Sequence, residues 1–298
     1  MRTGKMLWGL ILLILGIALL LNTLGIATFS LSDLFVWWPL LLIYWGMAAF
    51  TKSPNARLAV FILFLVIAAG LITASSYYGW IDYSRHEVAS QNLEKELSSD
   101  ITSATFTLQS GAGNFSVTST NSNQLVTASA QTSFGEYKLE TNQSGDHADV
   151  TLTMDDEGPF WHGMHAHMVH DVTARLSTVP AWDVIVDSGA ADVNLNLRDL
   201  IVQSVTVKSG ASSVDIEMGD RADRATVTVK TGASSVNILI PTTVEGKIYA
   251  DGGLSSHDFT GFVQQSDGSY ETPNYAHATK RVDINLSAGV SSLTVRRQ

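Results

Sequence analysis

A glycine-centred motif that recurs in the second half of the chain constrains the fold more than any other feature of the sequence. Each copy has an alternating run of residues, a small-residue corner with glycine, and a second alternating run. Three consecutive copies occupy residues 184–197, 205–218 and 227–240. Their glycines, Gly189, Gly210 and Gly232, follow one another at intervals of 21 and 22 residues. A fixed interval of this size is typical of stacked structural units, because one unit cannot bury its apolar side alone.

Three more copies share the same frame. A weaker fourth copy spans 248–259, with its glycine at Gly253, and two outlying copies span 106–117 and 284–295. The glycines of the outlying copies are Gly111 and Gly289. The longer interruption between copies is the 78-residue interval that precedes Gly189. The shorter one, 36 residues long, contains a polar excursion from Gln264 to His277, which we expect to form a protruding loop or hairpin.

Each copy alternates as a half-buried β-strand does. Val205 and Val207 form an apolar set, and Thr206 and Lys208 form the polar set between them. The corner glycine is expected to adopt a backbone conformation that other residues resist. A second alternating strand starts at Val214. Two strands and two corners in 21–22 residues therefore make one rung of a stack.

Stacked rungs predict an all-β domain over 101–298, a β-solenoid or β-roll with apolar columns inside. The corner serines Ser212, Ser234 and Ser255 are expected to form a ladder outside. His257 occupies a formally inward position, which predicts a distorted rung or one near an end of the stack. An antiparallel sandwich of hairpins is the alternative, although its strands have no reason to repeat one corner sequence.

Residues 1–80 have the opposite character and predict about three membrane-spanning helices. The apolar runs are 6–24, 34–50 and 58–78. The first run, at about 1.5 Å per residue, is roughly 28 Å long, close to the thickness of the hydrocarbon core. A cleaved signal peptide is disfavoured because two further apolar runs follow. The mixed segment 81–100 is expected to be a juxtamembrane linker, either a short amphipathic helix or a solvated stalk.

The distribution of charge predicts the orientation of the chain. Residues 1–80 carry Arg2, Lys5, Lys52 and Arg57 against one acid, whereas the rest of the chain brings the net charge to −10. Basic residues concentrate in cytoplasmic loops. We therefore expect a multi-pass cell-membrane protein with a cytoplasmic N-terminus and an extracytoplasmic β-domain.

The chain resembles a known family of bacterial envelope proteins. WGLILLILGIALLLNTLGI (8–26) and WPLLLIYWGMAAF (38–50) are similar to the LiaI–LiaF-like membrane region. The β-repeats resemble the toast-rack and LiaF C-terminal domains, through TFTLQSGAGNFSV (105–117), the GASSV copies and VDINLSAGVSSLTVRR (282–297). This resemblance implies a membrane-bound modulator of a two-component system for envelope stress. It implies no active-site residue.

Several classes of chemistry are disfavoured by composition and motif. The chain has no cysteine, so disulfides and thiolate metal sites are excluded. An acidic body disfavours binding to nucleic acid, because neutralising phosphates requires clustered Lys and Arg. No nucleotide-binding loop, nucleophile elbow or metalloprotease helix is present. The exposed carboxylates do not form a catalytic cluster in the sequence, and we expect the protein not to be an enzyme. They are Asp187, Asp192, Asp215 and Glu217.

One local cluster suggests a metal site. His162, His165, His167 and His170 fall within nine residues, beside acidic and methionine side chains. In an extended strand His165 and His167 would share a face, and imidazoles on one face can bind zinc or copper. The same histidines could sense acid, since their ordinary pKa is about 6.5. A solvated hairpin with incidental histidines is the alternative.

These observations predict a non-enzymatic, membrane-anchored envelope protein that senses or modulates envelope stress through partner contacts. The expected partners are the lipid bilayer and a membrane sensor kinase or another envelope protein. One alternative is a scaffold whose stacked rungs self-associate into a homo-oligomer. The other is an envelope metal-binding protein that uses the segment His162–His170.

Overall fold

The computed structural model describes a single residue near the N-terminus and most of the chain from residue 88 onward. The described ranges are 64, 88–133, 135–155 and 169–298. The described residues from 88 onward belong to one compact unit. The three expected membrane helices lie outside the described residues, apart from Phe64, which is helical. Within the described part, no helix is long and apolar enough to cross a membrane.

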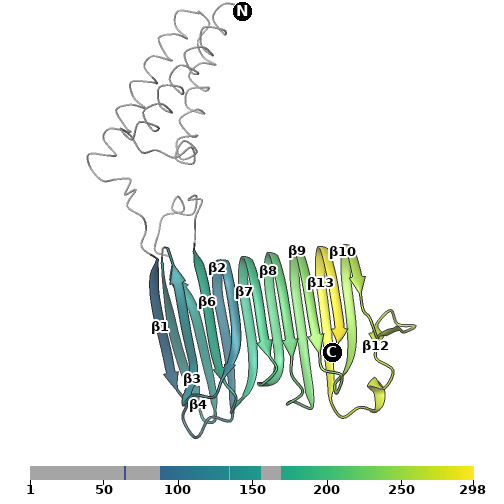
Figure 1. Cartoon of the computed structure of the whole chain (residues 1–298), viewed down its shortest axis with the longest axis horizontal. Helices are drawn as coiled ribbons and strands as arrows, with labels where there is room; N and C mark the ends of the chain where they lie inside the picture. Colours follow the sequence, from purple (N-terminus) through teal and green to yellow (C-terminus); the bar gives the residue numbers. More distant parts are fainter. Residues whose placement is uncertain (1–63, 65–87, 134, 156–168) are drawn as a thin grey trace, which may run out of the picture. The chain divides into compact units, whose positions relative to one another are not determined.

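The described residues form one mixed sheet of 13 strands, so the prediction of an all-β domain is confirmed. The strands are β1 Ala89–Glu96, β2 Ser103–Thr120, β3 Gln124–Thr132, β4 Glu136–Ser144, β5 His147–Asp155, β6 His170–Ser177, β7 Ala181–Leu197, β8 Ile201–Met218, β9 Arg224–Ile240, β10 Glu245–Asp258, β11 Val263–Gln264, β12 Tyr270–Glu271 and β13 Arg281–Arg297. A short 3-10 helix, η2, spans Tyr275–His277. Figure 1 shows the long strands side by side in one row.

Each long strand consists of two arms joined at the corner glycine. In β8, Val205 and Val207 are buried before the corner, and Val214 and Ile216 are buried after it. The buried positions change from odd to even numbers across Gly210, so the alternation reverses its phase at the corner. Both arms keep their apolar side toward one core because the strand bends at this point.

The six repeat copies are the long strands, and they lie parallel to one another in register. The order is β2-β7-β8-β9-β13-β10, and buried columns of Val, Ile and Leu run across it. One such column contains Val205 beside Val184 and Val227. The column residues are almost completely inaccessible to solvent. Stacking therefore supplies the core that a single rung lacks.

The C-terminal strand does not follow the order of the sequence. β13 is the last of the long strands in the chain, but it lies between β9 and β10 (Figure 1). The regularity of the two strands explains this difference. In β13, Ile284, Leu286 and Leu293 are all buried, whereas β10 presents His257 opposite Leu293. The more apolar strand thus occupies the inner place, and the irregular strand lies nearer the end.

The corner glycines are selected by contact with the next strand and not by backbone conformation. None of the six has a positive φ, so the conformational reason predicted from the sequence is wrong. Instead they form a column in which every corner glycine except Gly111 lies against the carbonyl of a neighbouring corner glycine. A Cβ placed on Gly232 would lie 2.6 Å from the oxygen of Gly210, and a Cβ on Gly210 would lie 2.9 Å from that of Gly189. Glycine permits this close approach of backbones.

The serine ladder exists, but the hydroxyls of Ser212 and Ser291 within it turn inward. Ser212, Ser234, Ser291 and Ser255 form one column. The hydroxyl oxygens of Ser212 and Ser291 are buried, and the Ser234 hydroxyl lies 2.6 Å from that of Thr231. The prediction of an outside ladder was wrong because Ser212 lies two residues before the buried Val214 and therefore shares its face.

The long interval before Gly189 contains shorter strands that extend the stack beyond β2. β5 and β6 pair in parallel with the two arms of β2. β4 then pairs antiparallel with β5, and β3 pairs antiparallel with β6. β5 and β6 together make one rung. β4 and β3 lie beyond this rung, and the chain runs through them in the opposite direction.

The chain enters the sheet within the segment that was expected to be a linker. Residues 81–100 were expected to form an amphipathic helix or a stalk, but residues 89–96 form β1, which pairs antiparallel with β3. The strand is mostly exposed: only Gln91 and Leu93 are partly buried, and Leu93 packs on the core. Its alternation is therefore too weak to be recognised in the sequence.

The polar excursion forms a hairpin at the opposite end, as predicted. β11 and β12 pair antiparallel, and β12 pairs with β10 through Lys247 and Ile248. His257 lies at this end of the stack, which confirms that its rung is terminal among the long strands. Its ring stacks on Phe259 with centroids 5.1 Å apart and meets the edge of Tyr270.

Candidate functional site

The segment with the predicted histidine ligands replaces one corner of the stack. β5 ends at Asp155 and β6 begins at His170, so the rung that they form has the segment 156–168 in place of a glycine corner. Three of the four candidate ligands lie in that segment, outside the described residues: His162, His165 and His167. The metal site thus remains a prediction.

His170 is the one candidate ligand that the structure describes. Its side chain is buried, with 6% of its surface exposed, and it shares a face with the buried Val172. Its backbone lies close to the β2 corner, where a Cβ on Gly113 would lie 2.4 Å from the His170 carbonyl oxygen. The next residue, Asp171, accepts a hydrogen bond of 2.6 Å from the Asn114 amide. No group of three metal-ligating side chains occurs among the described residues.

The four carboxylates considered for acid–base chemistry are spread over both arms of β7 and the second arm of β8 in the described part of the chain. Asp187 lies on the first arm of β7, and Asp215 and Glu217 lie on the second arm of β8. Asp215 accepts a hydrogen bond of 3.1 Å from Asn237, and Glu217 forms an ion pair with Arg198. These contacts are ordinary surface partners, and none joins two of the four carboxylates.

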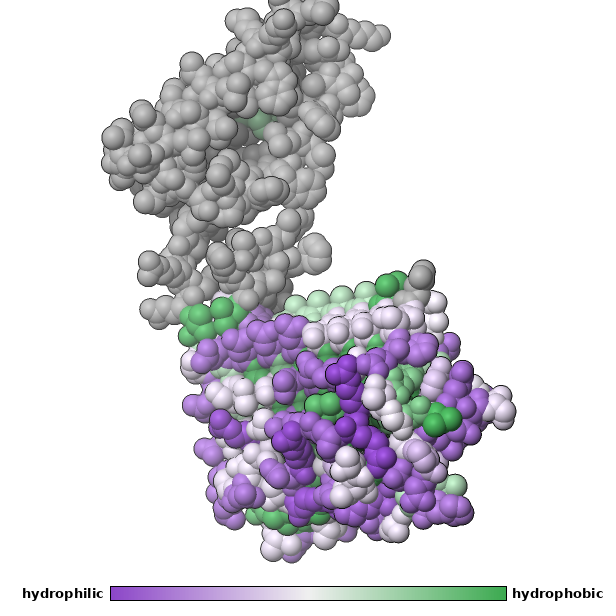
Figure 2. Space-filling view, turned by 45° about the vertical axis from the view of Figure 1, so that its right-hand side comes forward, coloured by the Kyte–Doolittle hydropathy of each residue, from purple (hydrophilic) through white to green (hydrophobic). Residues whose placement is uncertain are grey.

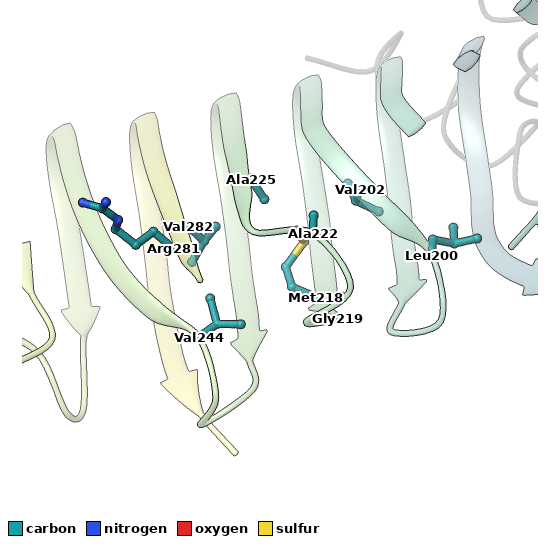
Figure 3. Close-up of a pocket in the computed structure, with 9 residues that line it drawn as sticks. All are labelled: Leu200, Val202, Met218, Gly219, Ala222, Ala225, Val244, Arg281 and Val282. Atoms are coloured by element: carbon teal, nitrogen blue, oxygen red, sulfur yellow. The ribbon is translucent and has the colours of Figure 1, made fainter. Parts of the chain in front are cut away.

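A small apolar cavity lies between the connections that link successive rungs (Figure 3). Met218, Val244 and Val282 are among its lining residues, and its volume is about 10 Å³. A single water molecule requires roughly 10–15 Å³. The cavity is therefore a packing gap and not a ligand site.

A larger groove lies on the outer face of the first arms near the β10 end. Its volume is about 460 Å³, within the range of about 300–1,000 Å³ that is usual for small-molecule sites. Its floor comes from β9, β13 and β10, and its wall is the turn between β11 and β12. The side chains of the floor include Thr228, Lys230, Asn285, Tyr249 and Asp251. Figure 2, in which this end of the sheet comes forward, shows a mostly hydrophilic surface.

Lys247 fixes the wall of the groove. Its Nζ lies 2.8 Å from Glu271 Oε1 and 3.5 Å from Asp267 Oδ2, and 15% of its side chain is exposed. The hydrogen bond to Glu271, followed by one to Tyr249, raises the pKa of Lys247. The Ser269 hydroxyl and backbone N–H both donate to Asp267 Oδ1, at 2.5 and 3.0 Å, and they hold the pKa of that carboxyl below its ordinary value. The turn is thus held against β10 by charge-assisted hydrogen bonds.

The floor of the groove presents side chains that have no protein partner among the described residues. Lys230, Asp251 and Asn285 form no side-chain hydrogen bond or ion pair within that part of the chain. Tyr249 keeps 45% of its surface exposed. Sequence reasoning missed this site. One signal for it was available in the sequence. Tyr249 is aromatic, whereas the same column contains Thr206 in β8 and Thr228 in β9.

Two family models match the chain in succession. The LiaF transmembrane domain matches residues 7–89, and the N-terminal domain of toast_rack matches residues 83–239, more than half of the chain. The first match identifies a membrane-associated protein. No curated protein sequence is significantly similar to the chain.

One solved structure shows a related fold. A candidate cell adhesion protein from Clostridium sporogenes superposes with a TM-score of 0.64 at 14% identity, over 71% of this chain and all of that chain. A candidate adhesin from Bacteroides fragilis gives a TM-score of 0.27 at 8% identity, over 70% of this chain and 97% of that chain. With its LiaF-type transmembrane domain followed by the β-stack, the chain belongs to the toast_rack family.

Proposed function

We propose that this envelope protein modulates stress signalling through partner contacts, with its β-domain held outside the cytoplasm by the N-terminal membrane helices. The observation that carries the proposal is the succession of a LiaF transmembrane domain and a toast_rack domain in one chain. The partner we expect is a membrane sensor kinase or another envelope protein. The positive charges at Arg2, Lys5, Lys52 and Arg57 support the orientation.

A role in binding agrees with the character of the domain better than catalysis does. The described residues provide two extended outer faces, one on each arm of the stacked strands, and these faces are rich in Thr, Ser, Asp and Lys. Two of the four inspected carboxylates use ordinary surface partners, Arg198 for Glu217 and Asn237 for Asp215. Rigid, repetitive faces of this kind suit contact with a large partner.

Deleting the gene and following the envelope-stress transcriptional response tests the proposal. We expect the amplitude or threshold of the response to cell-wall damage to change, and the full chain to restore it. A chain cut after residue 88, which keeps the LiaF-type region and removes the sheet, is expected to fail. An unchanged response in the deletion strain would rule out the signalling role.

Self-association is a second candidate, favoured by one observation at the β10 end. β12 pairs with β10 only through Lys247 and Ile248, so the part of β10 beyond Ile248 has no second strand beside it in the described structure. Exposed strand edges promote pairing with another chain. Light scattering of residues 88–298 distinguishes the candidates: a concentration-independent monomer would exclude the scaffold.

A further inference from the structure

We propose that the groove over β9, β13 and β10 is a saccharide-binding site. This inference goes beyond the proposed signalling role and does not depend on the orientation of the domain. Most of the lining residues, including Tyr249, Asp251 and Asn285, lie after residue 239, where the match to the toast_rack domain ends.

Tyr249 supplies the stacking surface that sugar recognition needs. The face of an aromatic ring carries negative charge density, and it attracts the weakly positive C–H groups on the flat side of a pyranose. The Lys247 ammonium lies 4.9 Å from the centroid of the Tyr249 ring, which orients the ring from one side. The ring nevertheless remains 45% exposed and lines the groove. A partly exposed, fixed aromatic ring is therefore available to a ligand.

The surrounding groups match the hydroxyls of a sugar. Asp251 accepts hydrogen bonds, Lys230 donates them, and the amide of Asn285 does both. These three side chains have no hydrogen-bond partner within the described residues, so a ligand would not have to displace one. Hydroxyl groups donate and accept, and a ligand that carries many of them satisfies this mixed set.

Other ligand classes fit the groove less well. The backbone groups of β9 and β13 beneath it are paired on both sides, so an extended peptide could add as a strand only at the outer edge of β10 and not over the floor of the groove. Two carboxylates, Asp251 and Asp267, face one unpaired ammonium, Lys230, which disfavours an anion such as phosphate. The described residues contain no cluster of three metal-ligating side chains. Among these ligand classes, a neutral ligand rich in hydroxyl groups fits the groove best.

Contacts within the protein hold the wall of the groove in place. Lys247 holds the turn at Asp267 and β12 at Glu271, so the cavity does not depend on a ligand to form. A preformed site loses less conformational freedom on binding than a mobile one. The groove is thus preorganised for a small ligand such as a short glycan.

Titration calorimetry of the full chain in detergent micelles tests the inference. The probes are a tetramer of β-1,4-linked N-acetylglucosamine and a tetramer of β-1,4-linked glucose, with inorganic phosphate as the anionic probe. We expect at least one tetramer to bind. We expect Tyr249→Ala to weaken that binding by about tenfold or more, and Asn285→Ala to weaken it measurably, whereas Tyr249→Phe retains it.

Thr206→Ala is the matched control, because Thr206 lies in the same column as Tyr249 but outside the groove. We expect it to bind as the unaltered protein does. Circular dichroism of each variant checks that the sheet is intact. No heat with either tetramer at millimolar concentration, binding of phosphate alone, or equal affinity in the Tyr249→Ala variant would each overturn the proposal.

Discussion

A methyl group on Gly210 would lie 2.9 Å from the carbonyl oxygen of Gly189 in the adjacent strand. Real Cβ atoms essentially never approach a backbone oxygen this closely, so two strands would have to separate to admit an alanine. The relationship recurs between Gly232 and Gly210 and between Gly289 and Gly232, at 2.6 Å in both cases. Glycine therefore recurs because adjacent strands approach closely at the corner, and not because the corner needs a special turn.

Replacing Gly210 by alanine is expected to destabilise the domain by about 1–3 kcal/mol, the usual cost of forcing extra atoms into a packed site. Gly111→Ala is the matched control, because a Cβ there meets nothing within 4 Å. Urea-dependent pulse proteolysis of the full chain measures both variants. Equal unfolding midpoints for the two would contradict the contact explanation and favour a conformational one.

Removing the charge of Glu271 is expected to release the β11–β12 hairpin. Glu271→Gln keeps the size of the side chain but loses the charge-assisted contact with Lys247. We expect the amides of residues 263–272 to exchange hydrogen about tenfold faster, with little change elsewhere. Hydrogen exchange read by mass spectrometry measures this effect. Glu217→Gln, which breaks the distant ion pair with Arg198, serves as the control. Unaltered hydrogen exchange in the Glu271→Gln variant would show that the contact between Lys247 and Glu271 does not hold the hairpin.

The hydrogen bond between Tyr275 and Asp283 is expected to be lost at alkaline pH. Burial, then a hydrogen bond donated to the Asp283 carboxylate, raises the pKa of Tyr275 to about 12. The neutral phenol is thus favoured in the folded state, whereas an unfolded tyrosine has a pKa of about 10. Its stabilising contribution is complete below pH about 10 and is lost as the pH rises through about 12.

Ultraviolet absorbance of phenolate compares the unaltered protein with Tyr275→Phe across this pH range. The difference between the two curves is expected to show one group ionising near pH 12. A difference curve centred near pH 10 would mean that Tyr275 is not held by Asp283.

The histidine segment gives a separate prediction. If it binds metal, calorimetric titration of the full chain with zinc or copper gives a saturable heat that His165→Ala/His167→Ala abolishes. His257→Ala is the control, because His257 packs on Phe259 and Tyr270 at the other end of the sheet. Indistinguishable heats for the unaltered and the double-variant protein would remove the metal hypothesis.

The regular part of the fold could be predicted because it depends on local alternation. Val184, Val205 and Val227 were assigned to one inward column from their spacing to the glycines, and they are fully buried in one column. The position of β13 could not be predicted in this way. Every regular rung can pack beside every other. The order of the strands therefore depends on whether β13 or β10, which carries His257, packs better against β9.

The groove could not be predicted because its parts come from separate stretches of the chain. Lys230 belongs to a regular repeat, Asn285 to the last strand and Asp267 to the excursion. They become neighbours only because β13 inserts between β9 and β10 and the hairpin packs on Lys247. Neither event has a signal in the local sequence. The histidine cluster, by contrast, can be recognised in the sequence from the spacing of its residues alone.

The location of the β-domain is the central claim, and reporter fusions after Gln298 test it most directly. Alkaline phosphatase folds to an active form only outside the cytoplasm, whereas green fluorescent protein exported through the general secretion route is dark. We expect an active phosphatase fusion and a dark fluorescent fusion in intact cells. An inactive phosphatase with a bright fluorescent fusion would place the domain in the cytoplasm and contradict the account.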